Sequence, residues 1–127
     1  MFADNEVFNG FAADDLEKAR QFYGETLGVR AEPMNDENTL LALKHPDGRD
    51  TLIYLKPDFV PATYTVLNFR VDDIEAVVDQ LAERGVATER YEEFEQDERG
   101  ILREGNAPPI AWFKDPAGNI LAAIAEQ

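Results

Sequence analysis

The sequence predicts an α+β fold made of two copies of one βαβββ unit. The first observation is an internal repeat, because residues 11–17 read FAADDLE and residues 69–75 read FRVDDIE. The second is that each copy leads through a segment of helix length to a Gly-Val pair, Gly28-Val29 and Gly85-Val86. The third is that each helix is followed by short β-type segments separated by turn residues.

In each unit, a β-type segment precedes a pair of aspartates that marks the start of a helix. The β-type segments are residues 7–13 and 64–71. An aspartate at this place caps a helix, because its carboxylate accepts hydrogen bonds from the free N–H groups of the first turn. The residues that follow predict an amphipathic helix, with one apolar stripe in each unit: Leu16, Ala19, Tyr23 and Leu27; Ile74, Val77, Val78 and Leu81.

Three further strands are expected after each helix. They are residues 31–34, 39–45 and 51–56 in the first unit, and residues 88–91, 110–114 and 119–125 in the second. Residues 45–48 and 115–118 each combine Pro and Gly in a pattern typical of tight turns. We therefore expect a single domain over residues 1–127, with one module over about 1–60 and the other over about 61–127.

Composition excludes several classes of partner. The chain has 12 basic and 26 acidic residues, so its formal net charge of −14 would repel nucleic acid. No apolar stretch reaches the roughly 20 residues that a membrane helix needs, and no membrane partner is expected. The absence of cysteine excludes disulfides and thiolate chemistry. Asp4 and Glu6 lie where a secretory signal would be basic or apolar, so a cytoplasmic protein is expected.

Residues 92–109 are mostly polar and show no periodicity, which predicts a long loop. At most one short ordered piece is expected in it, around Ile101-Leu102. Loops of this length are usually functional or mobile, and both readings stay open here. Residues 96–103 would be the part that acts as a lid, if there is one.

Several motifs together resemble the vicinal-oxygen-chelate superfamily, which includes glyoxalases, dioxygenases and bleomycin-resistance proteins. They are the helix motif DLEKA at residues 15–19 with Phe22-Tyr23 and Leu27-Gly28 after it, its repeat, and the ending FKDPAGN at residues 113–119. The resemblance implies that the two modules form a curved, half-open barrel around one cavity, usually in a homodimer. It also implies a divalent ion held by two ligands from each module, which would act as a Lewis acid.

The positions that match the family's metal ligands carry no good ligand in this chain. Counting from the helix motifs and the final turn gives Phe8, Val66 and Ala122, and the fourth position matches Tyr54. A shift of one residue brings in Val7 or Asn9, Thr65 or Leu67, and Leu121 or Ala123, none of them His, Glu or Asp. His45 lies beside a turn, where a solvated loop residue is expected, and the chain has no serine. We expect neither a metal nor another cofactor, and no catalytic residue is assigned.

Strand alternation predicts what the cavity contains instead. Phe8, Val66 and Tyr54 define the inward faces of their strands, and the turn at residues 115–118 places Trp112 opposite Ala122. Tyr91 and Phe94 lie where the long loop begins and can close over a ligand. The expected ligand-binding residues are Phe8, Leu52, Tyr54, Val66, Asn68, Arg70, Tyr91, Ile110, Trp112 and Ala122. The alternative is that these side chains simply fill the barrel as core.

The sequence thus favours metal-independent binding of a bulky aromatic or cationic small organic molecule. By resemblance to the metal-free antibiotic-binding resistance proteins, the result would be antibiotic resistance by sequestration. A metal-dependent lyase, isomerase or dioxygenase of the glyoxalase family is the alternative. It would need ligands that are not recognised here. A third hypothesis is a regulatory or partner-binding module with a vestigial cavity.

Overall fold

The computed structural model describes residues 1–126, which divide into two compact units. The first unit is Met1–Val60 and the second begins at Pro61. The first contains six elements in the order strand, helix and three strands: β1 (Asn9–Ala13), α1 (Leu16–Arg20), η1 (Gln21–Thr26), β2 (Arg30–Pro33), β3 (Leu40–Lys44) and β4 (Asp50–Leu55). The βαβββ order expected for this unit is therefore confirmed.

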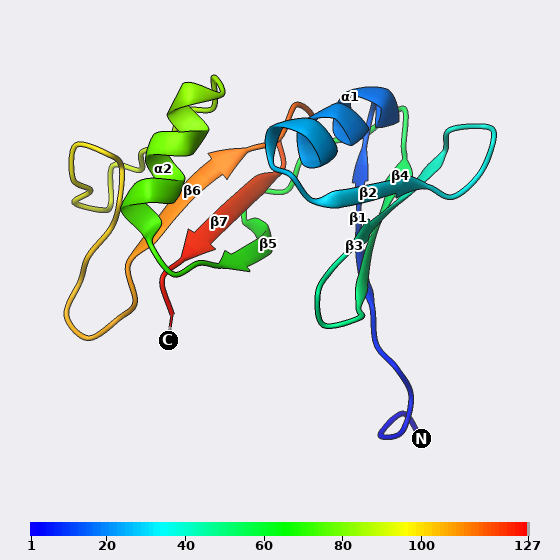
Figure 1. Cartoon of the computed structure of the whole chain (residues 1–127), viewed down its shortest axis with the longest axis horizontal. Helices are drawn as coiled ribbons and strands as arrows, with labels where there is room; N and C mark the ends of the chain where they lie inside the picture. Colours follow the sequence, from blue (N-terminus) through cyan, green and yellow to red (C-terminus); the bar gives the residue numbers. More distant parts are fainter. Residues whose placement is uncertain (127) are drawn as a thin grey trace. The chain divides into compact units, whose positions relative to one another are not determined.

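The four strands of the first unit form one sheet in the order β1-β4-β3-β2, with β1 parallel to β4 and the other pairs antiparallel (Figure 1). As expected, Asp15 caps the helix, since its Oδ1 accepts a hydrogen bond of 3.0 Å from the Lys18 amide. The helix widens after Arg20 into the π-helical segment η1, where Leu27 N donates to Phe22 O across five residues. Tyr23 on this segment is completely buried.

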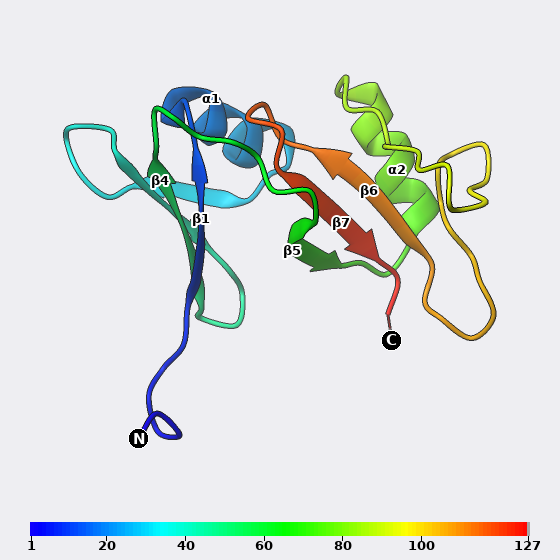
Figure 2. The same cartoon turned by 180° about the vertical axis from the view of Figure 1, so that it is seen from behind.

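The second unit contains β5 (Thr65–Arg70), α2 (Ile74–Glu83), β6 (Ile110–Lys114) and β7 (Ile120–Ile124). Its sheet has the order β5-β7-β6, and Figure 2 shows β7 between the two other strands. The Asp73 carboxylate caps α2 by accepting a hydrogen bond from the Ala76 amide at 3.1 Å. The helix buries its apolar stripe against the sheet in a cluster of Ile74, Val78, Ile101 and Ala111.

The expectation of a full strand at residues 88–91 is wrong. Only Glu89 bridges to Trp112 there, with its amide donating to the Trp112 carbonyl at 2.7 Å. The reason is that the Gln96 side chain forms hydrogen bonds with backbone groups that would otherwise pair with a neighbouring strand. Its Nε2 donates to the Glu89 carbonyl, and its Oε1 accepts from the Tyr91 amide. The chain therefore turns away after one bridge.

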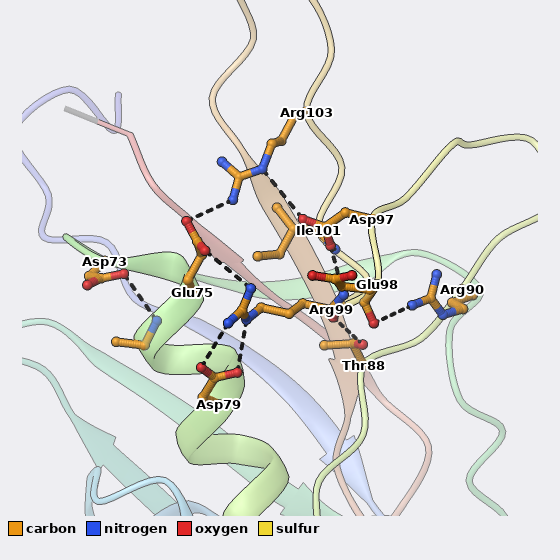
Figure 3. A network of polar contacts seen from close by, with 11 residues as sticks. Asp73, Glu75, Asp79, Thr88, Arg90, Asp97, Glu98, Arg99, Ile101 and Arg103 are labelled. Carbon is orange, nitrogen blue, oxygen red and sulfur yellow. Dashed lines mark hydrogen bonds and ion pairs between the residues drawn. The ribbon is translucent and has the colours of Figure 1, made fainter.

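The long loop is ordered at the place that the sequence indicated. Ile101 and Leu102 are buried, and Leu102 bridges to both Gln96 and Ile110. Ion pairs join this segment to α2, as Figure 3 shows. Arg99 lies 3.0 Å from Asp79 and 3.3 Å from Glu75. The segment around residues 96–102 is thus packed against its own unit.

Over residues 1–126, no helix combines the length and the apolar character needed to cross a bilayer. The half-open barrel concerns how the two sheets are placed together, and it stays a prediction.

Candidate functional site

Three aromatic rings of the second unit meet at the edge of its sheet. The rings of Phe94 and Trp112 are stacked, with centroids 5.4 Å apart and planes inclined by only 9°. Tyr91 meets Trp112 edge-on at 5.4 Å and Phe94 at 6.4 Å. Both distances and orientations are those of favourable aromatic pairs. We call Tyr91, Phe94 and Trp112 the aromatic trio.

The hairpin of β6 and β7 positions Trp112. The Asp115 Oδ1 atom accepts hydrogen bonds from the amides of Ala117 and Asn119 at 3.0 and 2.9 Å, which closes the turn. Trp112 then pairs with Ala122, as the turn sequence predicted. Because Asn68 pairs with Ala122 from the other side, the three residues form one row across the sheet.

Gln96 positions the other two members of the trio. Besides its bonds to the backbone of Tyr91 and Glu89, its Nε2 donates to the Gly100 carbonyl at 2.7 Å. One amide side chain therefore joins both ends of the turn that carries Phe94 to the packed segment beyond it. Phe94 N donates to Tyr91 O at 3.1 Å within this turn.

A hollow of about 160 Å³, here called the indole hollow, lies beside the trio. Thr65 and Ile120, two of its lining residues, are paired across β5 and β7. Tyr64 is a largely exposed wall residue and Glu93 supplies a carboxylate. The complete lining is Thr63, Tyr64, Thr65, Tyr91, Glu93, Phe94, Trp112 and Ile120. This volume is enough for one ring system.

A second hollow of about 530 Å³, here called the loop hollow, shares Tyr91 and Phe94 with the first. Its other lining residues are Arg90, Glu92, Glu95 and Gln96. Phe94 thus borders both spaces. Carboxylates are the prevailing charged groups around the two hollows.

The environment of the Tyr91 phenol is apolar and negative. Burial, and then the carboxylates of Glu89 and Glu93, raise the pKa of Tyr91 above its ordinary value. Its hydroxyl is buried and has no hydrogen-bond partner within residues 1–126. Glu89 also lies 3.6 Å from Lys114 Nζ. These surroundings therefore disfavour the ionised form of the phenol.

The first unit holds a separate hollow of about 470 Å³. Phe8 and Leu52, two of the expected ligand-binding residues, are part of its lining, together with Asn5, Glu6, Val7, Met34, Asp47, Gly48, Arg49 and Asp50. Phe8 precedes β1 and is 65% exposed, and Tyr54 on β4 is 48% exposed. Large aromatic side chains thus stay open to solvent within this unit.

Comparison with known proteins identifies the family. The model of the glyoxalase/bleomycin resistance protein/dioxygenase superfamily matches residues 10–122. The chain belongs to this superfamily. None of the curated proteins matches it.

Several solved structures share the fold. TnmS3, an antibiotic binding protein from Streptomyces sp. CB03234, is 28% identical over 98% of both chains, with a TM-score of 0.68. A glyoxalase family protein from Enterococcus faecalis is 24% identical over 98% of this chain and 99% of its own, with a TM-score of 0.67. A lactoylglutathione lyase from Agrobacterium tumefaciens is 20% identical over 96% and 94%, with a TM-score of 0.65.

The metal that the superfamily implies does not fit the residues found here. Phe8, Val66 and Ala122 offer only hydrocarbon side chains, and Tyr54 offers a phenol. Divalent ions are held in proteins by imidazole, carboxylate, thiolate or amide groups. In the described part of the chain, no three His, Cys, Asp or Glu side chains are grouped so that they could hold a metal ion.

His45 lies in the loop beside the turn, as expected, but it is half-buried and forms a specific contact. Its Nε2 lies 2.8 Å from the hydroxyl of buried Thr51, which in turn donates to Asn9 Oδ1 at 2.8 Å. Because the Thr51 hydroxyl uses its proton toward Asn9, the His45 Nε2–H is the donor in the first contact. This histidine therefore joins the end of β3 to β4 and β1.

The structure brings some of the expected site residues together. Tyr91 and Trp112 both line the indole hollow, and Ala122 lies next to Trp112 in the pairing of the strands. Ile110 is on the same strand as Trp112, two residues away. Arg70 instead forms an ion pair of 2.8 Å with Glu126.

The regular alternation expected along residues 64–70 is wrong at Val66. The register of β5 shifts between Thr65 and Leu67, so Thr65 pairs with Ile120. A bulge of this kind places two residues of one strand opposite one residue of its partner. As a result Thr65 lines the indole hollow, and Val66 does not. Thr65 was missed for this reason.

Proposed function

We propose that this protein binds a bulky aromatic or cationic small organic molecule without a metal ion and sequesters it unchanged. The observation that carries the proposal is the aromatic trio, which borders a hollow that Thr65 and Ile120 of the sheet also line. Ligand sites are usually concave and mostly apolar, with a few polar groups that set orientation. The indole hollow combines aromatic rings with polar groups, which include the hydroxyls of Thr63 and Thr65 and the carboxylate of Glu93.

The energetics favour flat ligands and positive charge. An aromatic pair contributes about 0.5–1.5 kcal/mol beyond the area that it buries. A cation over a ring face contributes about 0.5–2 kcal/mol. The formal net charge of −14 adds a long-range attraction for cations.

The similarity to TnmS3 supports the same class of function, since that protein is an antibiotic binding protein. We extend this to resistance by sequestration in the cytoplasm. The protein would act as a homodimer. Holding a toxic molecule requires tight binding and slow release, and no reacting group.

Fluorescence titration tests the proposal, because Trp112 is the only tryptophan of the chain. We expect a saturable change in its emission with at least one compound from a panel of glycopeptides, anthraquinones and enediyne-like molecules. Calorimetry of W112A should then show at least about tenfold weaker binding of the same compound, because a stacking surface is lost. F2A removes a phenylalanine from the exposed N-terminal segment and serves as the control.

A flat response to the whole panel in both measurements would contradict the proposal. Elemental analysis of protein purified without chelator addresses the enzymatic alternative. Stoichiometric Fe, Mn, Ni or Zn would show that the chain holds a metal, and it would favour a lyase, isomerase or dioxygenase.

A further inference from the structure

Phe94 covers Trp112 in the way that a flat ligand would. The two rings are nearly parallel, at 9°, with centroids 5.4 Å apart. This separation indicates an offset stack, the arrangement that planar aromatic molecules prefer. A ligand that stacks on this part of the indole must therefore compete with Phe94.

The volumes of the two hollows also indicate a role for Phe94. The indole hollow of about 160 Å³ is smaller than the 300–1,000 Å³ typical of pockets for drug-sized molecules. The loop hollow of about 530 Å³ is separate from it, and Phe94 and Tyr91 line both. Movement of the Phe94 ring would join the two spaces.

The turn that carries Phe94 is anchored at its ends and open in its middle. Gln96 binds the backbone of Tyr91, Glu89 and Gly100, so the ends of the turn stay in place. Glu92, Glu93 and Glu95 on the same turn are exposed. Phe94 is half-buried, and the ring contacts described above are with Tyr91 and Trp112. Its ring can therefore rotate away without breaking the Gln96 contacts.

We infer that Phe94 occupies the ligand's stacking position on Trp112 in the free protein, and that a planar aromatic cation displaces it. This inference rests on the proposed function and specifies both the ligand class and the residue that controls entry. Phe94 acts as an internal competitor, so binding is weaker and more selective than the bare indole would allow.

Charge selects the cation among planar molecules. Glu93 lines the indole hollow, and Glu92 and Glu95 line the loop hollow. Arg90 also lines the loop hollow and donates to the Glu98 backbone carbonyl at 2.8 Å, so one guanidinium faces the carboxylates of Glu92, Glu93 and Glu95. Lys114 lies 3.6 Å from Glu89. A planar cation between the two hollows would meet carboxylates on both sides.

Calorimetric titration with 9-aminoacridine, a planar cation, and with acridine, its neutral analogue at pH 7.5, tests the inference. F94A should bind 9-aminoacridine about 3- to 10-fold more tightly than wild type, because the competing stack is lost. Wild type should prefer 9-aminoacridine to acridine, and E93Q should reduce that preference. In the absence of any ligand, F94A should make Trp112 fluorescence more accessible to acrylamide. F2A should match wild type in all of these measurements.

Weaker or unchanged binding of 9-aminoacridine by F94A would overturn the inference while leaving the proposed function in place. Weaker binding would mean that Phe94 holds the ligand in a sandwich. Equal affinity of wild type for the cation and its neutral analogue would overturn the choice of ligand class. If neither wild type nor F94A bound either probe or any member of the antibiotic panel, the proposed function itself would be overturned.

Discussion

The Tyr91 ring meets the Trp112 indole edge-on, with centroids 5.4 Å apart and planes at 84°, while the Tyr91 hydroxyl is buried without a hydrogen-bond partner in the described chain. The Tyr91 ring thus stabilises the aromatic trio, whereas burial of its hydroxyl destabilises this arrangement. A buried polar group that finds no partner costs free energy, because it has given up its hydrogen bonds to water. Burial also raises the pKa of this phenol, followed by the effect of Glu89 and Glu93.

Replacement of Tyr91 by phenylalanine should therefore raise the free energy of unfolding, by up to about 1 kcal/mol. The ring contacts would be kept and the unsatisfied hydroxyl removed. Urea denaturation followed by Trp112 fluorescence measures the change. Y54F removes an exposed hydroxyl and should change stability by less than about 0.5 kcal/mol. A clear loss of stability in Y91F would show that its hydroxyl is satisfied, for example by bound water.

Gln96→Ala should destabilise the second unit by about 1–3 kcal/mol, because it removes the bonds to one amide and two carbonyl groups. The Tyr91 amide should then exchange its hydrogen with solvent much faster, which hydrogen exchange followed by NMR detects. Q80A on the exposed face of α2 provides the control. Unchanged protection at Tyr91 would mean that Gln96 does not hold the turn.

Gly100→Ala should destabilise the protein more than the same change at Gly85. Both glycines have positive φ, +83° and +82°, where an alanine costs about 1–2 kcal/mol. Of the two, only Gly100 lies where the new Cβ would collide with Thr88 Oγ1, and that hydroxyl donates to the Arg99 carbonyl. Thermal melting of the two variants, compared side by side, gives the answer. Equal melting temperatures would show that Thr88 moves aside freely.

Asp97 should make the packed loop sensitive to acid. Burial alone would raise its pKa, but the amides of Ile101 and Arg99, together with Arg103, outweigh that effect and hold the pKa below its ordinary value. Its contribution to stability is then complete above the unfolded-state pKa of about 4. That contribution is lost as the pH falls through the lower folded-state pKa.

The stability difference between wild type and D97N should accordingly be largest near neutral pH and shrink below about pH 4. Denaturation at a series of pH values measures it. D36N replaces an exposed aspartate and should show no such dependence. A D97N difference that stays constant into acid would exclude this role for the Asp97 charge.

Much of the fold could be predicted from local rules in the sequence. The aspartate caps at Asp15 and Asp73 depend on contacts three residues away along the chain. The pairing of Trp112 with Ala122 follows from a tight turn whose residues are adjacent in sequence. Such features are readable because the interacting groups are close along the chain and their geometry is narrow.

Other features were decided only when distant segments packed together. The bulge at Val66 depends on how β5 aligns with β7, and the loss of a strand after Glu89 depends on Gln96. The stack of Phe94 on Trp112 joins a polar loop to a strand beyond it. Such hydrogen bonds and ring contacts join residues that are far apart in the sequence. The local sequence does not specify which of several possible partners each group will find. For this reason the sequence indicated an aromatic site, while the tertiary structure determined which ring covers the indole.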